Sequence, residues 1–90
     1  MPKVQRDGDV NVKGGIALGG AETVFVNGEK VMLPDMPVTP HRKGKKHKKA
    51  ITRGGSSTVF AEGQPIIHVD DYDSCSHKRH GGSEDVFVEE

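Results

Sequence analysis

The chain has few of the residues from which a large hydrophobic core is built. Of its 90 residues, 32% are hydrophobic and 4% are aromatic, and tryptophan is absent. A chain this short forms one domain at most, and its core is marginal. Composition alone would also fit a disordered chain, but the apolar residues are clustered and the net charge of +0 brings no self-repulsion. We therefore expect one ordered domain over residues 1–90, stabilised by a metal or a partner.

Several other features are missing, and each absence excludes a class of protein. The single cysteine, Cys75, cannot form an internal disulfide. Residues 1–12 lack the apolar segment of a signal peptide, and no apolar run approaches the ~20 residues of a membrane span. We expect a protein made in the cytoplasm, and export by a machine that ignores signal peptides stays open. Between the 12 glycines and 5 prolines no apolar helical stripe exceeds one turn, which predicts an all-β fold.

One ten-residue phrase occurs three times, as GGAETVFVNG at 19–28, GGSSTVFAEG at 54–63 and GGSEDVFVEE at 81–90. Each copy predicts a strand, at 23–26, 58–61 and 85–88. The first two copies continue through Asn27-Gly28 and Glu62-Gly63 turns into return strands at 29–33 and 65–69, whereas the third copy ends before a return strand. Shorter strands are expected at 15–18 and 50–53. The repeat therefore predicts that one hairpin unit occurs three times along the chain.

The three phenylalanines of the chain, Phe25, Phe60 and Phe87, occupy the same position of the repeat. Alternation along a strand places each Phe on one face and its Val or Ala neighbours on the other. We expect the three rings to point inward and to form a small core with approximate three-fold symmetry. The alternative is that each Phe packs locally in one of three unrelated hairpins.

The unequal segments between the copies contain the residues that can bind a metal. His41 and His47 lie in the first segment, 34–49, and Cys75, His77 and His80 lie in the second, 70–80. Imidazole and thiolate are the ligands that Zn²⁺ prefers. If the repeats stack, both segments emerge at the same end and can supply one zinc site. The alternative is a set of ordinary solvated histidines.

The basic run at 42–49 is a second candidate, because it could contact phosphates. No aromatic residue is interleaved to stack on bases, and Asp70, Asp71 and Asp73 balance the positive charge. A solvated loop is the simpler interpretation, so we expect no nucleic-acid partner. Nor do we expect an enzyme, since a Cys75–His77 or Cys75–His80 pair would lack an orienting third group and a pocket.

The phrase at 55–71, GSSTVFAEGQPIIHVDD, resembles the repeat of PAAR-repeat proteins, which runs loosely G-S-x-x-V-F-[VI]-N-G-x-P-A-A-R-x-G-D. Residues 19–35 match less closely and are interpreted as one residue short, residues 82–88 end early, and residues 6–9 resemble the opening R-x-G-D of such domains. The family also carries T-P-H, a second His and S-C-G-H, which are similar to Thr39-Pro40-His41, His47 and Ser74-Cys75-Ser76-His77.

The resemblance implies one zinc per chain, held by three His and one Cys. Carried over, the ligands are His41, His47, Cys75 and His77. His80, three residues further on, could substitute for His77, because Ser76 replaces the usual glycine of the motif. Lys13 stands where many relatives have another His, so no ligand is expected there.

The resemblance further implies a small conical or pyramidal all-β fold of three quasi-equivalent β-hairpin repeats, with zinc near the apex. Such a protein is the structural tip of a membrane-piercing spike. Because the sequence has no room for a fused toxin, we expect a stand-alone tip. One tip monomer caps a trimeric β-helical spike protein and briefly contacts the target membrane, with no small-molecule substrate. It would be assembled on the baseplate of a phage tail, and hence in the virion, or on a type VI secretion spike, and the sequence does not separate the two. The alternative function is a small zinc-dependent nucleic-acid-binding module that uses the basic loop 42–49.

Overall fold

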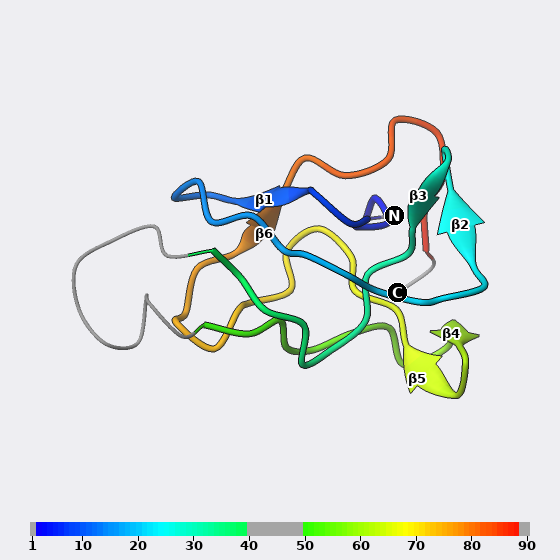
Figure 1. Cartoon of the computed structure of the whole chain (residues 1–90). Coiled ribbons are helices and arrows are strands. Elements are labelled where there is room, and N and C mark those ends of the chain that lie inside the picture. The colour runs from blue at the N-terminus through cyan, green and yellow to red at the C-terminus, as the bar shows by residue number, and fades with distance from the viewer. Residues whose placement is uncertain (1, 40–49, 89–90) are drawn as a thin grey trace.

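The structure is a computed structural model that describes residues 2–39 and 50–88. The strands within these residues are short: β1 (Val10–Asn11), β2 (Phe25–Val26), β3 (Glu29–Lys30), β4 (Phe60–Ala61), β5 (Gln64–Pro65) and β6 (Arg79–His80). They pair antiparallel as β1–β6, β2–β3 and β4–β5 (Figure 1). The described part of the chain contains no helix, and so none that could cross a membrane. The expected all-β class is confirmed.

The two predicted hairpins are present, with the predicted turns. β2 and β3 are joined by Asn27-Gly28, and β4 and β5 by Glu62-Gly63, and all four turn residues have φ between 54° and 82°. Positive φ at both central positions gives the turn a twist that matches the twist of the paired strands. Pairing is also in the same register in the two copies, Phe25 with Lys30 and Phe60 with Pro65. The first two copies are therefore equivalent throughout the hairpin.

The third copy takes its return strand from the other end of the chain. Lys3 pairs with Phe87, as Lys30 pairs with Phe25. The Val4 amide donates to the Val86 carbonyl at 3.0 Å, and the Val31 amide donates to the Val24 carbonyl at 2.9 Å in the first copy. The N-terminal segment thus completes the third unit and closes the set of three.

The three return segments meet in a closed cycle of backbone hydrogen bonds. The Gln5 amide donates to the Ile67 carbonyl (3.0 Å), the Ile67 amide to the Met32 carbonyl (2.9 Å), and the Met32 amide to the Gln5 carbonyl (3.0 Å). All three residues have an exposed fraction of 0%. Each copy therefore contacts the other two at one point, around an approximate three-fold axis.

The second glycine of each repeat allows a return segment to approach closely. A Cβ added at Gly20 would lie 2.4 Å from the Val31 carbonyl oxygen, and one at Gly82 would lie 2.8 Å from the Val4 carbonyl oxygen. Both glycines also have positive φ, 128° and 90°. Only glycine fits such a position without displacing the neighbouring backbone.

The phenylalanines do not form the core, contrary to the expectation from the sequence. Phe25, Phe60 and Phe87 are 55%, 57% and 44% exposed. The residue after each Phe points inward instead: Ala61 and Val88 are buried, and Val26 packs against the same cluster. Because the return segments already lie within hydrogen-bonding distance of one another at the axis, small aliphatic side chains fill the space and three phenyl rings cannot. The buried members of this cluster are Val4, Ala21, Val31, Leu33, Ala61, Ile66 and Val88.

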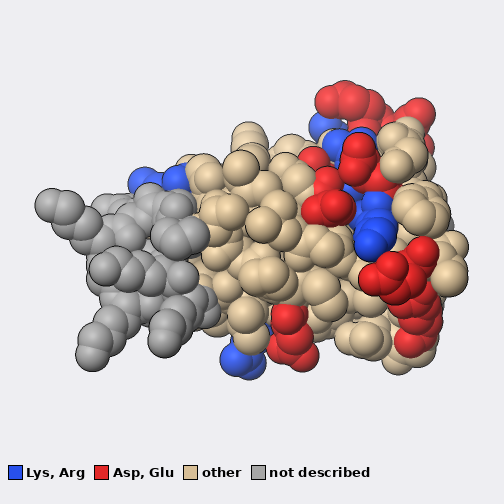
Figure 2. Space-filling view, viewed as in Figure 1, with Lys and Arg blue, Asp and Glu red and all other residues tan. Residues whose placement is uncertain are grey.

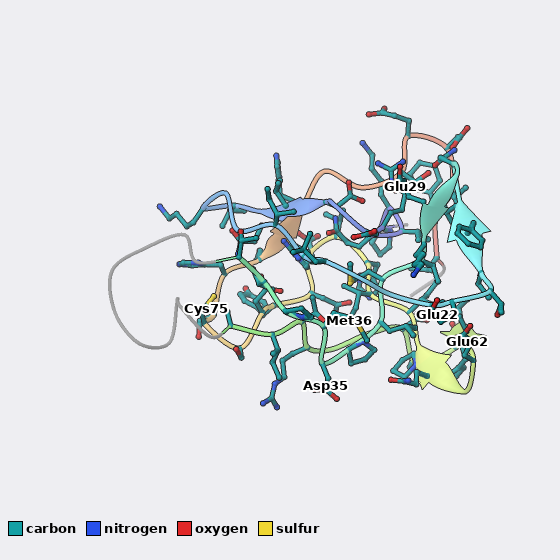
Figure 3. All side chains as sticks on the ribbon, in the orientation of Figure 1. Glu22, Glu29, Asp35, Met36, Glu62 and Cys75 are labelled. Atoms are coloured by element: carbon teal, nitrogen blue, oxygen red, sulfur yellow. The ribbon has the colours of Figure 1, made fainter. Side chains whose placement is uncertain are left out.

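The remaining chain extends away from the hairpins as a ladder of isolated bridges. Ala17 pairs with Val38, Pro37 with Ile51, and Thr52 with Asp73, which places the short segments expected at 15–18 and 50–53 in extended pairing. Sequence reasoning did not identify β1 and β6, which pair residues from opposite ends of the chain. Hairpins β2–β3 and β4–β5 lie at one end of the molecule, here called the hairpin end, and Cys75 lies toward the other (Figures 1 and 3).

Candidate functional site

The hairpin end presents a repeated apolar surface, here called the Phe face. It consists of Val24 and Phe25, Val59 and Phe60, and Val86 and Phe87, one pair from each copy. The three valines are each 37% exposed and the three phenylalanines 44–57% exposed. Single exposed apolar residues need no explanation, but the same pair exposed three times in equivalent positions is a patterned surface.

Side-chain hydrogen bonds link the copies around the Phe face. The Thr23 amide and hydroxyl of the first copy donate to Glu62 Oε2 of the second, at 2.9 and 2.7 Å. Asn27 Nδ2 of the first copy donates to Asp85 Oδ1 of the third at 2.9 Å. In both links the fifth residue of one copy meets the ninth of another. The matching ninth residue of the third copy is Glu89, outside the described residues.

These links also change the acidity of two carboxyl groups. Hydrogen bonds from the Thr23 side chain and backbone lower the pKa of Glu62. Hydrogen bonds from Asn27 and Ser83 lower the pKa of Asp85. Hydrogen bonds to a carboxylate favour its charged form, so both groups stay ionised at neutral pH.

The second candidate is the turn that carries Cys75 and His77, at the end opposite the hairpins (Figure 3). Cys75 is buried, and its Sγ lies 3.6 Å from His77 Nδ1. Two ligands at typical Zn–S and Zn–N distances of about 2.3 and 2.05 Å, at a tetrahedral angle, lie about 3.6 Å apart. The spacing and chemistry of this pair therefore fit two adjacent positions of a zinc site.

The other predicted ligands are His41, His47 and the substitute His80. His41 and His47 are outside the described residues. His80 is exposed on β6 and lines an open groove of about 440 Å³ with Lys3, Asp70 and Phe87. Among residues 2–39 and 50–88 no three His, Cys, Asp or Glu side chains converge as a metal-binding group.

The Cys75 turn is held by local hydrogen bonds and one strained residue. The Asp73 amide donates to the His77 carbonyl, and the Ser76 amide to the Asp73 carbonyl, both at 2.9 Å. Ser76 has a φ of 71°, a conformation that favours glycine. The serine therefore adopts this backbone at a cost that a glycine would not have.

A buried polar network anchors this turn, and sequence reasoning did not identify it. Asp73 Oδ2 accepts a hydrogen bond from Asn11 Nδ2 at 2.9 Å, and Asp73 Oδ1 lies 3.6 Å from Arg79 Nε. Arg79 Nη2 also donates to the Gly15 carbonyl at 3.0 Å. Burial lowers the pKa of Arg79, and the charge of Asp73 opposes that shift. The sequence offers no signal for this pairing, since Asn11 and Asp73 lie far apart along the chain.

No protein-family model matches the chain, and no curated protein matches it at a significant level. Its function is therefore inferred from the Phe face and the Cys75 turn.

Proposed function

We propose that the protein is the structural tip of a membrane-piercing spike, on a contractile phage tail or a type VI secretion apparatus. The observation that carries this proposal is the Phe face, in which three equivalent Val–Phe pairs are exposed at one end of a monomer. This is the function that the resemblance to PAAR-repeat proteins implies.

A trimeric partner accounts for the three-fold repetition of the surface. The end of a true trimer presents the same contact site three times around its axis. A monomer with three quasi-equivalent copies can place one Val–Phe pair against each subunit, so one tip caps one trimer. Half-exposed aromatic rings are strong anchors for such contacts, because they carry large apolar area with few rotatable bonds.

The hydrogen-bond cycle suits the molecule to an axial load. Gln5, Met32 and Ile67 cross-link the three copies through backbone groups that have no exposed area. Force applied along the axis would be shared by three bonded segments instead of one. We infer that this cycle stiffens the pyramid between the spike and its point.

Zinc would stabilise the opposite end, next to the second buried cluster. The buried cluster there comprises Ala17, Met32, Val38, Ala50, Ile67 and Cys75. Cys75 and His77 have the spacing of two zinc ligands, and His41 and His47 would complete the site. Metal binding would then supply folding free energy at the point that meets the target membrane.

Co-purification with the trimeric β-helical spike protein encoded by a neighbouring gene tests the proposal. Light scattering of the eluted complex should give the mass of one chain per spike trimer. A Phe25→Ser/Phe60→Ser variant should not co-elute, whereas Tyr72→Ala, which removes a ring 51% exposed outside the Phe face, should. A complex with three chains per trimer, or one that tolerates loss of both Phe rings, would refute it.

A further inference from the structure

Exposed carboxylates gather at the hairpin end, with lysine and arginine side chains among them (Figure 2). We call them the acidic rim: Glu22, Glu29, Glu62, Glu84 and Asp85. The basic side chains of the same three units, Lys3, Arg6 and Lys30, are all only partly exposed. A partner that docks on the hairpin end therefore meets carboxylates as well as the exposed Val and Phe side chains.

The rim is only partly neutralised within the molecule. Lys30 Nζ lies 3.2 Å from Glu22 Oε2, and the Arg6 guanidinium is bound to Asp9, which is not part of the rim. Glu62 and Asp85 accept hydrogen bonds from uncharged side chains. Glu29 and Glu84 form neither an ion pair nor a side-chain hydrogen bond within the described residues. The charge of Arg6 also acts on Glu29 through space, but both carboxylates are exposed and can meet a partner.

We infer that the end face of the spike trimer carries lysine or arginine side chains around its apolar contact sites, and that the acidic rim selects it. The inference rests on the proposed function and adds the chemistry of the partner. Opposite charges at the edge of an apolar contact accelerate association, whereas like charges placed opposite one another exclude wrong partners. The apolar centre supplies affinity to any trimer of suitable shape, so the rim supplies the discrimination.

Three engineered probes test this inference. Each probe is the same trimeric β-helical spike fragment. The residues around the contact sites on its end face are changed to Lys in the first probe, to Gln in the second and to Glu in the third. Association rates with the full chain are measured at about 50 mM and about 500 mM salt, where the screening length falls from roughly 14 to roughly 4 Å. The wild-type chain should associate at least ~10-fold faster with the Lys face than with the Glu face at low salt, and this ratio should fall toward one at high salt.

Charge reversal should invert this preference. The double variant Glu29→Lys/Glu84→Lys should associate faster with the Glu face than with the Lys face. Its association rate with the Gln face should differ from that of the wild-type chain by less than about two-fold. Asp35→Asn removes an exposed carboxylate away from the rim (Figure 3) and should leave the preference for the Lys face unchanged. Binding to all three faces at equal, salt-independent rates would overturn the inference and leave the proposed function standing. Failure to bind any face would overturn the proposed function, and the inference with it.

Discussion

Substitution of Phe60 by alanine tests whether this aromatic ring is exposed or belongs to the core. Phe60 is 57% exposed, and its chain neighbour Ala61 is buried. If the rings formed the core, Phe60→Ala would leave a cavity and cost about 3–5 kcal/mol. In the structure the ring lies outside the buried cluster, so the free energy of unfolding should change much less.

The expected magnitude follows from the area that the ring buries. A phenylalanine carries about 200 Å² of surface, and the 43% of Phe60 that is not exposed corresponds to about 85 Å². Alanine retains part of that contact, so about 60 Å² is lost, or about 1.5 kcal/mol at about 25 cal/mol per Å². The exposed part, about 110 Å², would be buried by the spike trimer, which predicts an affinity loss of about 2.8 kcal/mol, or about 100-fold.

Urea denaturation followed by circular dichroism measures the first value, and titration with the spike trimer measures the second. Ile67→Ala is the control, because Ile67 has no exposed area and its loss should cost about 2–5 kcal/mol. A loss for Phe60→Ala as large as that for Ile67→Ala would refute the exposed position of the ring. Unchanged affinity for the trimer would refute the role of the Phe face in docking.

Four further predictions concern the metal, the strained turn, the buried ion pair and pH. Elemental analysis should find one zinc per chain, and chelation or Cys75→Ser should lower the melting temperature by more than about 10 °C; an unchanged melting temperature contradicts this. Ser76→Gly should raise the free energy of unfolding by about 0.5–1 kcal/mol, since it relieves a φ of 71°, and a clear decrease in urea denaturation would count against it. Arg79→Met should cost about 3–5 kcal/mol in the same assay, because it leaves the Asp73 carboxylate buried without its cation, and a loss under about 1 kcal/mol would be inconsistent with that pairing. The lowered pKa values of Glu62 and Asp85 mean that both carboxylates contribute stability above the ordinary carboxyl pKa, about 4, and lose it as the pH falls through the lowered values. Glu62→Gln/Asp85→Asn should therefore flatten the decline of the urea midpoint between about pH 5 and about pH 2, and an unaltered decline would show that other groups cause it.

Local features of the fold could be predicted from the sequence because they depend on neighbouring residues. The hairpins follow from Asn27-Gly28 and Glu62-Gly63, whose positive φ angles are set within the turn itself. The all-β class follows from glycine and proline spacing. The pairing of Cys75 with His77 in one turn needs only two residues of separation, and the structure places their side chains 3.6 Å apart.

Contacts between distant segments could not be predicted in this way. The third copy lacks a return strand in sequence order, and residues 3–5 supply it from the opposite end of the chain. The sequence held a weak signal for this pairing, because residues 6–9 (RDGD) correspond to residues 68–71 (HVDD). In the structure the Arg6 amide donates to Asp9 Oδ2, and the His68 amide donates to Asp71 Oδ2 in the same way. No comparable sequence pattern predicts the contacts of Asp73 with Asn11 and Arg79.

The sequence by itself determined that the chain is a set of three equivalent β units, because a repeat of Val-Phe and Gly-Gly prescribes the same local geometry wherever it occurs. The tertiary structure decided which face of each unit is buried. Alternation along a strand states which side chains share a face, but not which face turns inward. That choice depends on how closely the units approach, and here the backbone cycle of Gln5, Met32 and Ile67 leaves room beside it for aliphatic side chains but not for three phenyl rings. The phenylalanines are consequently excluded from the core and remain exposed at the hairpin end.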